Sequence, residues 1–168
     1  MLIGVFLGRG VSTKDAVSAA ETLRGHLAGD VQWIGMEPGP VVGHDPVQMF
    51  EAEVGYRDAS PEVLVLPGGF GSHELAGDPD LVDWIGSVAG EARGVLAVST
   101  GTLLLAATGI LAGCGVAGHW LTSREIAATG AHLTASQVEV HGRIVTVSGS
   151  VSAAFGAKLL ADLITYGP

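Results

Sequence analysis

The stretch Val95-Leu-Ala-Val-Ser99-Thr100-Gly101 decides the fold. Its apolar, β-branched run is typical of a buried strand, and the small polar residue and glycine that follow are typical of a sharp turn. An alanine-rich helix, predicted over Thr102–Leu111, begins directly after the turn. A strand, a tight turn and a helix whose N-terminus points at the turn residue make a nucleophile elbow. We therefore expect the chemistry of this protein at Ser99.

Strands and helices alternate through most of the chain. Strands are predicted at Leu2–Leu7, Val31–Met36, Val63–Leu66 and Val95–Val98; helices at Thr13–Leu27, Asp80–Ala89, Thr102–Leu111, Trp120–Ala128 and Ser152–Ile164; and hairpins at Val41–Phe50, with His44-Asp-Pro46 as its tip, and at Gln137–Val147. Because the strands are apolar throughout, the pattern predicts one α/β domain over residues 1–168, a mostly parallel sheet covered by helices on both faces. The loops after Leu7, Leu66 and Val98 should then converge on one crevice at the carboxyl ends of the strands.

Composition excludes several classes of protein. Hydrophobic residues make up 48% of the 168 residues and charged residues 15%, which argues against disorder. The net charge of −9, without a basic stripe, argues against binding to nucleic acid or to an anionic membrane. The start of the chain lacks a basic signal-peptide region, and no apolar run reaches membrane-spanning length, so a cytoplasmic protein is expected. The single cysteine, Cys114, excludes an internal disulfide and a cysteine-rich zinc site.

The candidate residues each have a structural interpretation beside the functional one. Ser99 suits a nucleophile elbow but also a helix N-cap. The loop Pro67-Gly68-Gly69-Phe70-Gly71 can supply backbone N–H groups to an oxyanion hole, together with the N–H of Thr100, or can be an ordinary glycine-rich turn. Asp15 suits acid–base chemistry, or simply the positive end of a helix.

The aromatic residues and histidines are the remaining candidates. Phe70, His73 and Trp120 are expected to form pocket walls, and His119 is either structural or a general base. The other histidines show no metal-ligand spacing, and no metal or cofactor is expected: His26, His44, His132 and His141.

Five segments, spread over nearly the whole length, resemble the ThiJ/PfpI superfamily, and within it most closely the isonitrile hydratase branch. They are Gly10-Val-Ser-Thr-Lys-Asp15-Ala-Val, Val63-Leu-Val-Leu-Pro-Gly-Gly69, Val98-Ser-Thr-Gly101 with Leu103-Leu-Leu-Ala-Ala-Thr-Gly-Ile-Leu111, Gly118-His119-Trp120, and Val147-Ser-Gly-Ser-Val-Ser152. The resemblance implies a flavodoxin-like three-layer sandwich that forms a homodimer and acts on a small-molecule substrate.

The resemblance also implies roles for individual residues. The family nucleophile corresponds to Ser99, the acidic residue beside it to Asp15, and the threonine that follows it to Thr100. The N–H groups of Gly69 and Thr100 correspond to the oxyanion donors. In that branch a cysteine thiolate attacks the terminal carbon of an isonitrile, the acid protonates this carbon, and water then releases an N-substituted formamide without a cofactor.

The sequence departs from the family pattern in three places. Ser99 replaces the cysteine, Ser18-Ala19 replaces a Gly-Pro pair, and Gly113-Cys114-Gly115 replaces a basic turn. The first departure matters most, because a helix N-terminus can convert a thiol to a thiolate at neutral pH, whereas a serine hydroxyl needs a general base within reach.

Four hypotheses follow from the serine. The protein is a hydratase or lyase without a covalent intermediate, in which Asp15 is the general acid and base and Ser99 and Thr100 position the reactants. Alternatively, Ser99 is a true nucleophile and the protein is a serine hydrolase, with Asp15 or His119 as the local candidates for its base. In a third hypothesis, catalysis is lost and the domain is a ligand-binding or regulatory module. In a fourth, Ser99 is an engineered replacement of a native cysteine, with the same implications for the substrate as the first.

Overall fold

The computed structural model describes residues 1–45 and 47–167, and Pro46, at the predicted tip of the Val41–Phe50 hairpin, lies outside them. Its strands are β1 (Leu2–Leu7), β2 (Asp30–Gly35), β3 (Gly39–Val42), β4 (Met49–Ala52), β5 (Val54–Gly55), β6 (Val63–Leu66), β7 (Gly94–Val98), β8 (Gly115–Val116), β9 (His132–Leu133), β10 (Val138–His141) and β11 (Ile144–Val147). Its helices are α1 (Thr13–Leu27), α2 (Ser72–Leu75), α3 (Pro79–Glu91), α4 (Gly101–Ala106), α5 (Ser123–Ala128) and α6 (Ser150–Tyr166), with short 3₁₀ turns η1 (Tyr56–Asp58) and η2 (Trp120–Thr122).

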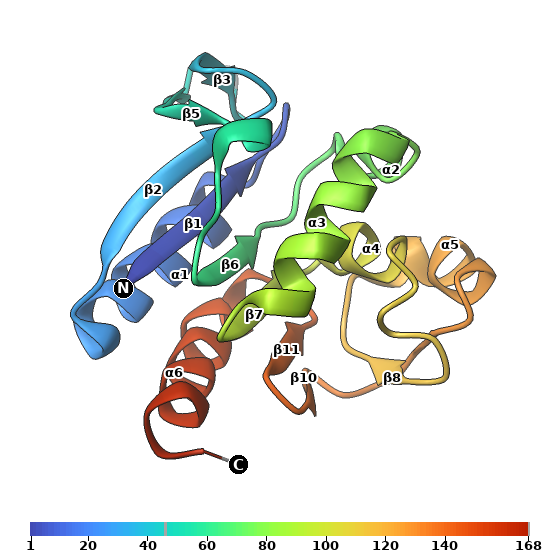
Figure 1. The fold of residues 1–168 in the computed structure, drawn as a ribbon. Coiled ribbons are helices and arrows are strands. Elements are labelled where there is room, and N and C mark those ends of the chain that lie inside the picture. The colour runs from blue at the N-terminus through green and yellow to red at the C-terminus, as the bar shows by residue number, and fades with distance from the viewer. Residues whose placement is uncertain (46, 168) are drawn as a thin grey trace.

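A seven-stranded sheet in the order β10-β11-β7-β6-β1-β2-β5 forms the middle of the molecule (Figure 1). Its strand pairs are parallel except for β10 and β11, which form the antiparallel hairpin expected around His141-Gly142. The predicted α/β, mostly parallel fold is therefore confirmed. The strands of the expected Val41–Phe50 hairpin are also present as β3 and β4, paired outside the main sheet.

The two faces of the sheet carry separate cores, because successive strand side chains point to opposite sides. Ile3, Val5 and Leu7 of β1 pack with α1 and α6, which also contact each other. Phe6 of the same strand faces the other way and packs with α3 and α4. Figure 1 shows α3 in front of the sheet and α1 behind it. Helices thus cover both faces, which gives the three layers expected.

Four predicted helices begin or end elsewhere than expected. The helix predicted over Asp80–Ala89 is longer at both ends and spans Pro79–Glu91. The helix predicted over Thr102–Leu111 is shorter, because the Thr108 hydroxyl donates to the Leu105 carbonyl and Gly109 then turns the chain at φ 82°. The segment predicted as Trp120–Ala128 opens with the 3₁₀ turn η2, and the final helix begins at Ser150 rather than Ser152. The early end of α4 lets the chain turn back toward the sheet. The earlier start of α6 places its first residue closer to the end of β11.

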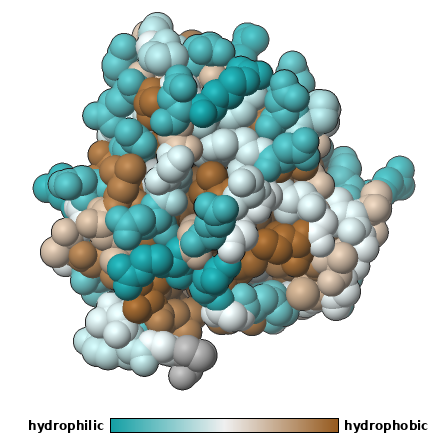
Figure 2. Space-filling model, in the orientation of Figure 1, coloured by the Kyte–Doolittle hydropathy of each residue, from teal (hydrophilic) through white to brown (hydrophobic). Residues whose placement is uncertain are grey.

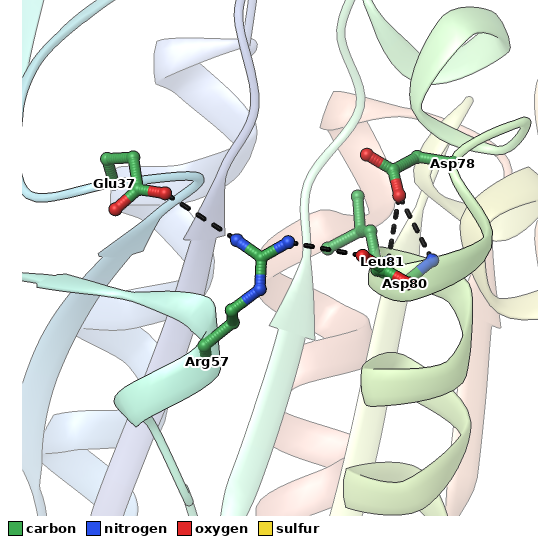
Figure 3. Close-up of polar contacts among 5 residues, drawn as sticks. All are labelled: Glu37, Arg57, Asp78, Asp80 and Leu81. Carbon is green, nitrogen blue, oxygen red and sulfur yellow. Dashed lines mark hydrogen bonds and ion pairs between the residues drawn. The ribbon is translucent and has the colours of Figure 1, made fainter.

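An exposed network of charges joins the β2 side of the molecule to α3. Figure 3 shows the Arg57 guanidinium between Glu37, at 3.6 Å, and Asp80, at 3.3 Å. The guanidinium carbon of Arg57 also lies 4.7 Å from the ring centroid of Tyr56. Burial of the Tyr56 phenol raises the pKa of Tyr56 above its ordinary value. Because the three charged side chains are largely exposed, their net contribution to stability is about 1 kcal/mol or less for each pair.

Hydrophilic side chains spread over the face drawn in Figure 2, with smaller hydrophobic patches between them. None of the helices in the described part of the chain is long and apolar enough to cross a membrane.

Replacing Asp78 by alanine should lower the free energy of unfolding by about 1 kcal/mol. Asp78 is the N-cap of α3, and its Oδ1 accepts hydrogen bonds from the N–H groups of Asp80 and Leu81 at 3.1 and 3.2 Å (Figure 3). Urea unfolding measures the loss. Asp78→Asn keeps a capping oxygen and should cost only a few tenths of that, about 0.3 kcal/mol; equal losses in the two variants would show that the cap is not the cause.

Candidate active site

Four strand ends contribute to one cleft of about 440 Å³. The segments after β1, β6, β7 and β11 line it with residues 12–15, residues 68–70, residues 99–100 and Ser150. The loops after Leu7, Leu66 and Val98 therefore converge as expected. The remaining lining residues come from segments outside these loops: His44, Gln48, His73, His119 and Leu121.

Ser99 occupies a sharp turn at the end of β7. Its φ is 57°, a left-handed conformation that costs a residue with a side chain about 1–2 kcal/mol. Backbone contacts hold the turn: the Ser99 N–H donates to the Val147 carbonyl at 2.9 Å, and the Ser99 carbonyl accepts from the N–H groups of Thr102 and His119 at 3.3 Å each. The elbow geometry expected from the sequence is therefore present.

Glycine at position 101 allows this turn. A Cβ there would lie 2.1 Å from the Leu66 carbonyl oxygen and 2.7 Å from the Pro67 carbonyl oxygen. Any side chain would push α4 away from the end of β6. The missing side chain of Gly101 thus lets the first turn of α4 lie against the glycine-rich loop.

Thr100 holds the glycine-rich loop with its side chain. Its Oγ1 accepts from the Gly69 N–H at 2.8 Å and donates to the Gly69 carbonyl at 3.1 Å, while the Ser72 hydroxyl lies 3.1 Å away. The Gly69 N–H, expected as an oxyanion donor, is therefore already bonded within the protein, which corrects that expectation. The Thr100 N–H has no acceptor among the described residues and is the donor still open to a ligand.

Asp15 is a buried carboxylate beside the elbow, with 1% of its surface exposed. Its Oδ2 accepts from the Gly68 N–H at 3.2 Å, and its Oδ1 accepts from the Ser150 hydroxyl. A Cβ built on Gly68 would lie 2.9 Å from Asp15 Oδ2 and 3.0 Å from Ser99 Cβ. The carboxylate and the serine thus both border the space that a side chain at position 68 would occupy, so only glycine fits there.

Helix N-termini surround this carboxylate. Asp15 lies in the first turn of α1, whose N-cap is Ser12, and the Ser12 Oγ accepts from the Asp15 N–H at 3.3 Å. Ser150 is the first residue of α6. The N-terminal ends of these two helices therefore lie beside the Asp15 carboxyl group.

Ser150 is a residue of the cleft that sequence reasoning missed. Its hydrogen bond to Asp15 joins residues 135 positions apart, so no local pattern indicates it. One signal was available: Ser150 follows β11 as Ser12 follows β1, and a small polar residue between an apolar strand and a helix suits the carboxyl end of a parallel sheet.

The expected aromatic walls are only partly present. Phe70 lines the cleft, is 74% exposed and stacks on His44 at a centroid distance of 4.3 Å. Trp120 is not among the lining residues, whereas its neighbour Leu121 is. The Trp120 ring is 72% exposed and stacks on His119 at a centroid distance of 5.7 Å. His119 lines the cleft, and its Nδ1 accepts from the Leu121 N–H at 3.2 Å.

The serine hydroxyl has no activating partner in the described structure. No hydrogen bond joins Ser99 Oγ to a histidine or a carboxylate among residues 1–45 and 47–167. A serine nucleophile requires such a bond and a third group that orients the base. The arrangement therefore lacks the contact that the hydrolase hypothesis requires.

Glu139 of β10 is a hydrogen-bonded carboxylate that does not line the cleft. The Thr134 hydroxyl donates to Glu139 Oε1 at 2.8 Å, and hydrogen bonds from Thr134 and Ser136 hold the pKa of this carboxyl below its ordinary value. Over the described ranges, no group of three or more His, Cys, Asp or Glu side chains could hold a metal ion.

Comparisons with known proteins agree with this geometry. A model of the DJ-1/PfpI family matches residues 1–162, which confirms the resemblance to that superfamily. The ThiJ/PfpI domain protein of Brachyspira murdochii superposes with a TM-score of 0.86 over 98% of this chain and 95% of that one, at 16% identity. That likeness supports the flavodoxin-like fold.

Two curated relatives match parts of the chain. The isonitrile hydratase of Pseudomonas putida is 34% identical over 101 residues, which cover 60% of this chain and 44% of the hydratase. The HTH-type transcriptional regulator Rv1931c of Mycobacterium tuberculosis is 40% identical over 58 residues, which cover 34% of this chain and 22% of the regulator. The matched stretches thus span less than half of either relative.

Ser99→Gly should be more stable than Ser99→Ala by about 1 kcal/mol, because both variants lose the hydroxyl but only alanine keeps a Cβ at positive φ. Thermal or urea unfolding of the two proteins measures the difference. Equal stabilities, or a more stable alanine variant, would show that the turn at Ser99 stores no backbone strain.

Proposed function

We propose that this chain, which belongs to the DJ-1/PfpI family, is a cofactor-independent hydratase or lyase that acts on a small apolar substrate of the isonitrile type. The observation that carries the proposal is the buried carboxylate of Asp15, held by Gly68 and Ser150 beside the elbow in an open cleft. The relationship to the isonitrile hydratase of Pseudomonas putida supports the substrate class.

In the proposed reaction Asp15 is the general acid. It donates a proton to the terminal carbon of the isonitrile, which makes this carbon electrophilic. Water adds to the same carbon, one of its protons is transferred to nitrogen and the other returns to Asp15, which gives an N-substituted formamide and restores the acid. The reaction adds one molecule of water and needs no oxidant or reductant.

Ser99 and Thr100 position the reactants in this proposal. A hydroxyl without a base in hydrogen-bond contact is a poor nucleophile, so Ser99 Oγ binds the water or the substrate rather than attacking it. The open N–H of Thr100 faces the partial negative charge that develops during addition. The exposed ring of Phe70 and the side chain of Leu121 offer apolar surface to the substituent on nitrogen.

A second candidate function is ligand binding without turnover. The 40% identity to part of the regulator Rv1931c favours it, as does the absence of an activated nucleophile at Ser99 in the described residues. In this alternative the same cleft holds a small molecule, and Asp15 and Thr100 are binding groups only.

Asp15→Asn should reduce turnover of an alkyl isonitrile by about 10²-fold or more, whereas Ser99→Ala should reduce it by about tenfold or less. The asparagine keeps the size of the side chain but cannot supply the proton. Formation of the N-substituted formamide, followed by mass spectrometry, measures both rates. The opposite ranking, together with covalent labelling of Ser99 by a phosphonate, would favour the serine hydrolase. Bound isonitrile without turnover in any form would favour the binding module.

Ser99→Cys provides a second test on a small panel of isonitriles. We expect the serine protein to be active and the cysteine variant to be at least as active, because the elbow places either atom at the same helix N-terminus. Activity in the cysteine variant alone would mean that the reaction requires a thiolate. This result would overturn the proposal that Asp15 catalyses hydration without a covalent intermediate. Inactivity of both would overturn the substrate class.

A further inference from the structure

His73 contacts a carboxylate at the wall of the cleft. It lies on α2 and lines the same cleft as Asp15 and Ser99. Its Nδ1 lies 3.2 Å from Oε1 of Glu125, which belongs to α5 and is not a lining residue. Nδ1 thus faces the carboxylate, and Nε2 has no hydrogen-bond partner among the described residues.

The position of His73 is tied to the elbow. The neighbouring Ser72 is buried, and its hydroxyl lies 3.1 Å from Thr100 Oγ1. Thr100 in turn holds Gly69 and follows Ser99 directly. Since α2 also packs against α4, the turn of helix that carries the imidazole is attached to the residues that shape the site.

The other two histidines of the cleft lack this arrangement. His119 uses Nδ1 to accept a hydrogen bond from the Leu121 N–H, and His44 stacks on Phe70. Neither forms an ion pair with a carboxylate within the described ranges. A carboxylate at Nδ1 orients an imidazole and fixes the proton there, which leaves Nε2 as a base. His73 is thus the cleft histidine prepared for proton transfer.

We propose that His73 and Glu125 form a second acid–base pair of the cleft, in which His73 is the general base that activates the attacking water and Glu125 is a positioning residue. The inference rests on the proposed hydration of an isonitrile and deepens it. Asp15 protonates the substrate carbon, and His73 removes a proton from the attacking water.

The proton transfers balance. Asp15 gives its proton to the terminal carbon, and the oxygen of water bonds to the same carbon while His73 Nε2 takes a proton from that water. The product of this step is a formimidic acid, with Asp15 ionised and His73 protonated. His73 then returns its proton to nitrogen and Asp15 takes the hydroxyl proton, which yields the formamide and restores both residues.

Several charged and titratable groups surround this pair. Glu74 is the next residue on α2, Glu125 faces the ring from α5, and the cleft adds Lys14, Asp15 and two histidines, His44 and His119. Both members of the pair are half exposed, each with 46% of the side chain accessible. Water therefore reaches the imidazole directly from solvent.

The test compares His73→Ala, Glu125→Gln and the control Glu74→Gln in the isonitrile assay. We expect His73→Ala to lower kcat by about 10²-fold and to lose the acidic limb of the pH profile, with added imidazole recovering at least about tenfold. Glu125→Gln keeps an acceptor oxygen but loses the charge and should lower kcat by about tenfold. Glu74→Gln also removes one negative charge, from the turn of α2 that carries His73, and should leave the rate unchanged.

The outcomes separate this inference from the proposed function. Full activity in His73→Ala, with wild-type turnover present, would overturn the base and leave the hydratase standing. A loss that imidazole does not rescue, with an unchanged pH profile, would overturn it as well by showing a structural role. No turnover in either the wild-type or the Ser99→Cys protein would overturn the hydratase, and the base with it.

Discussion

The left-handed backbone of Ser99 is the constraint on which the site depends. A residue with a side chain adopts this conformation only when its surroundings determine it, and here the end of β11, the first turn of α4 and the segment before η2 all bond to the same peptide units. The side chain of Thr100 then forms two hydrogen bonds with Gly69 of the glycine-rich loop. Because Gly101 has no side chain, α4 can lie against the end of β6. One turn thus places a hydroxyl, an open N–H and a carboxylate in a common cleft.

The proposed chemistry of the cleft depends on the absence of a general base bonded to Ser99 in the described structure. An oxygen at Ser99 has no bonded base among the described residues, so acid–base work passes to neighbouring groups. Asp15 is buried and hydrogen-bonded, whereas His73 and Glu125 are half exposed. Two titratable sites in such different surroundings suit two different proton transfers, one sheltered and one open to water.

Sequence reasoning located the elements that local patterns determine. The bounds of β1, α1 and β6 agree with the structure because an unbroken apolar run or a helical face specifies each of them. The elbow and its glycine were also predictable, since the strand, turn and helix are contiguous. The early end of α4 was not, because a hydroxyl–carbonyl bond within one turn and a glycine at positive φ override an alanine-rich sequence. The hydrogen bond that engages the Gly69 N–H and the hydrogen bond from Ser150 to Asp15 both join distant segments, so no local pattern predicts them. The single domain and the homodimer stay predictions.

The hydrogen bonds of Asp15 also tie the site to the folding of the whole chain. Its partners Gly68 and Ser150 lie 53 and 135 positions away, after β6, which neighbours β1 in the sheet, and after β11, which lies two strands beyond β6. No fragment that lacks α6 can complete this set, and a transient detachment of that last helix would leave the carboxylate without its hydroxyl partner while the rest of the sheet stayed paired. The hydrogen-bond set of Asp15 is therefore complete only while α6 is docked, so the polar contacts of the cleft depend on the packing of that helix.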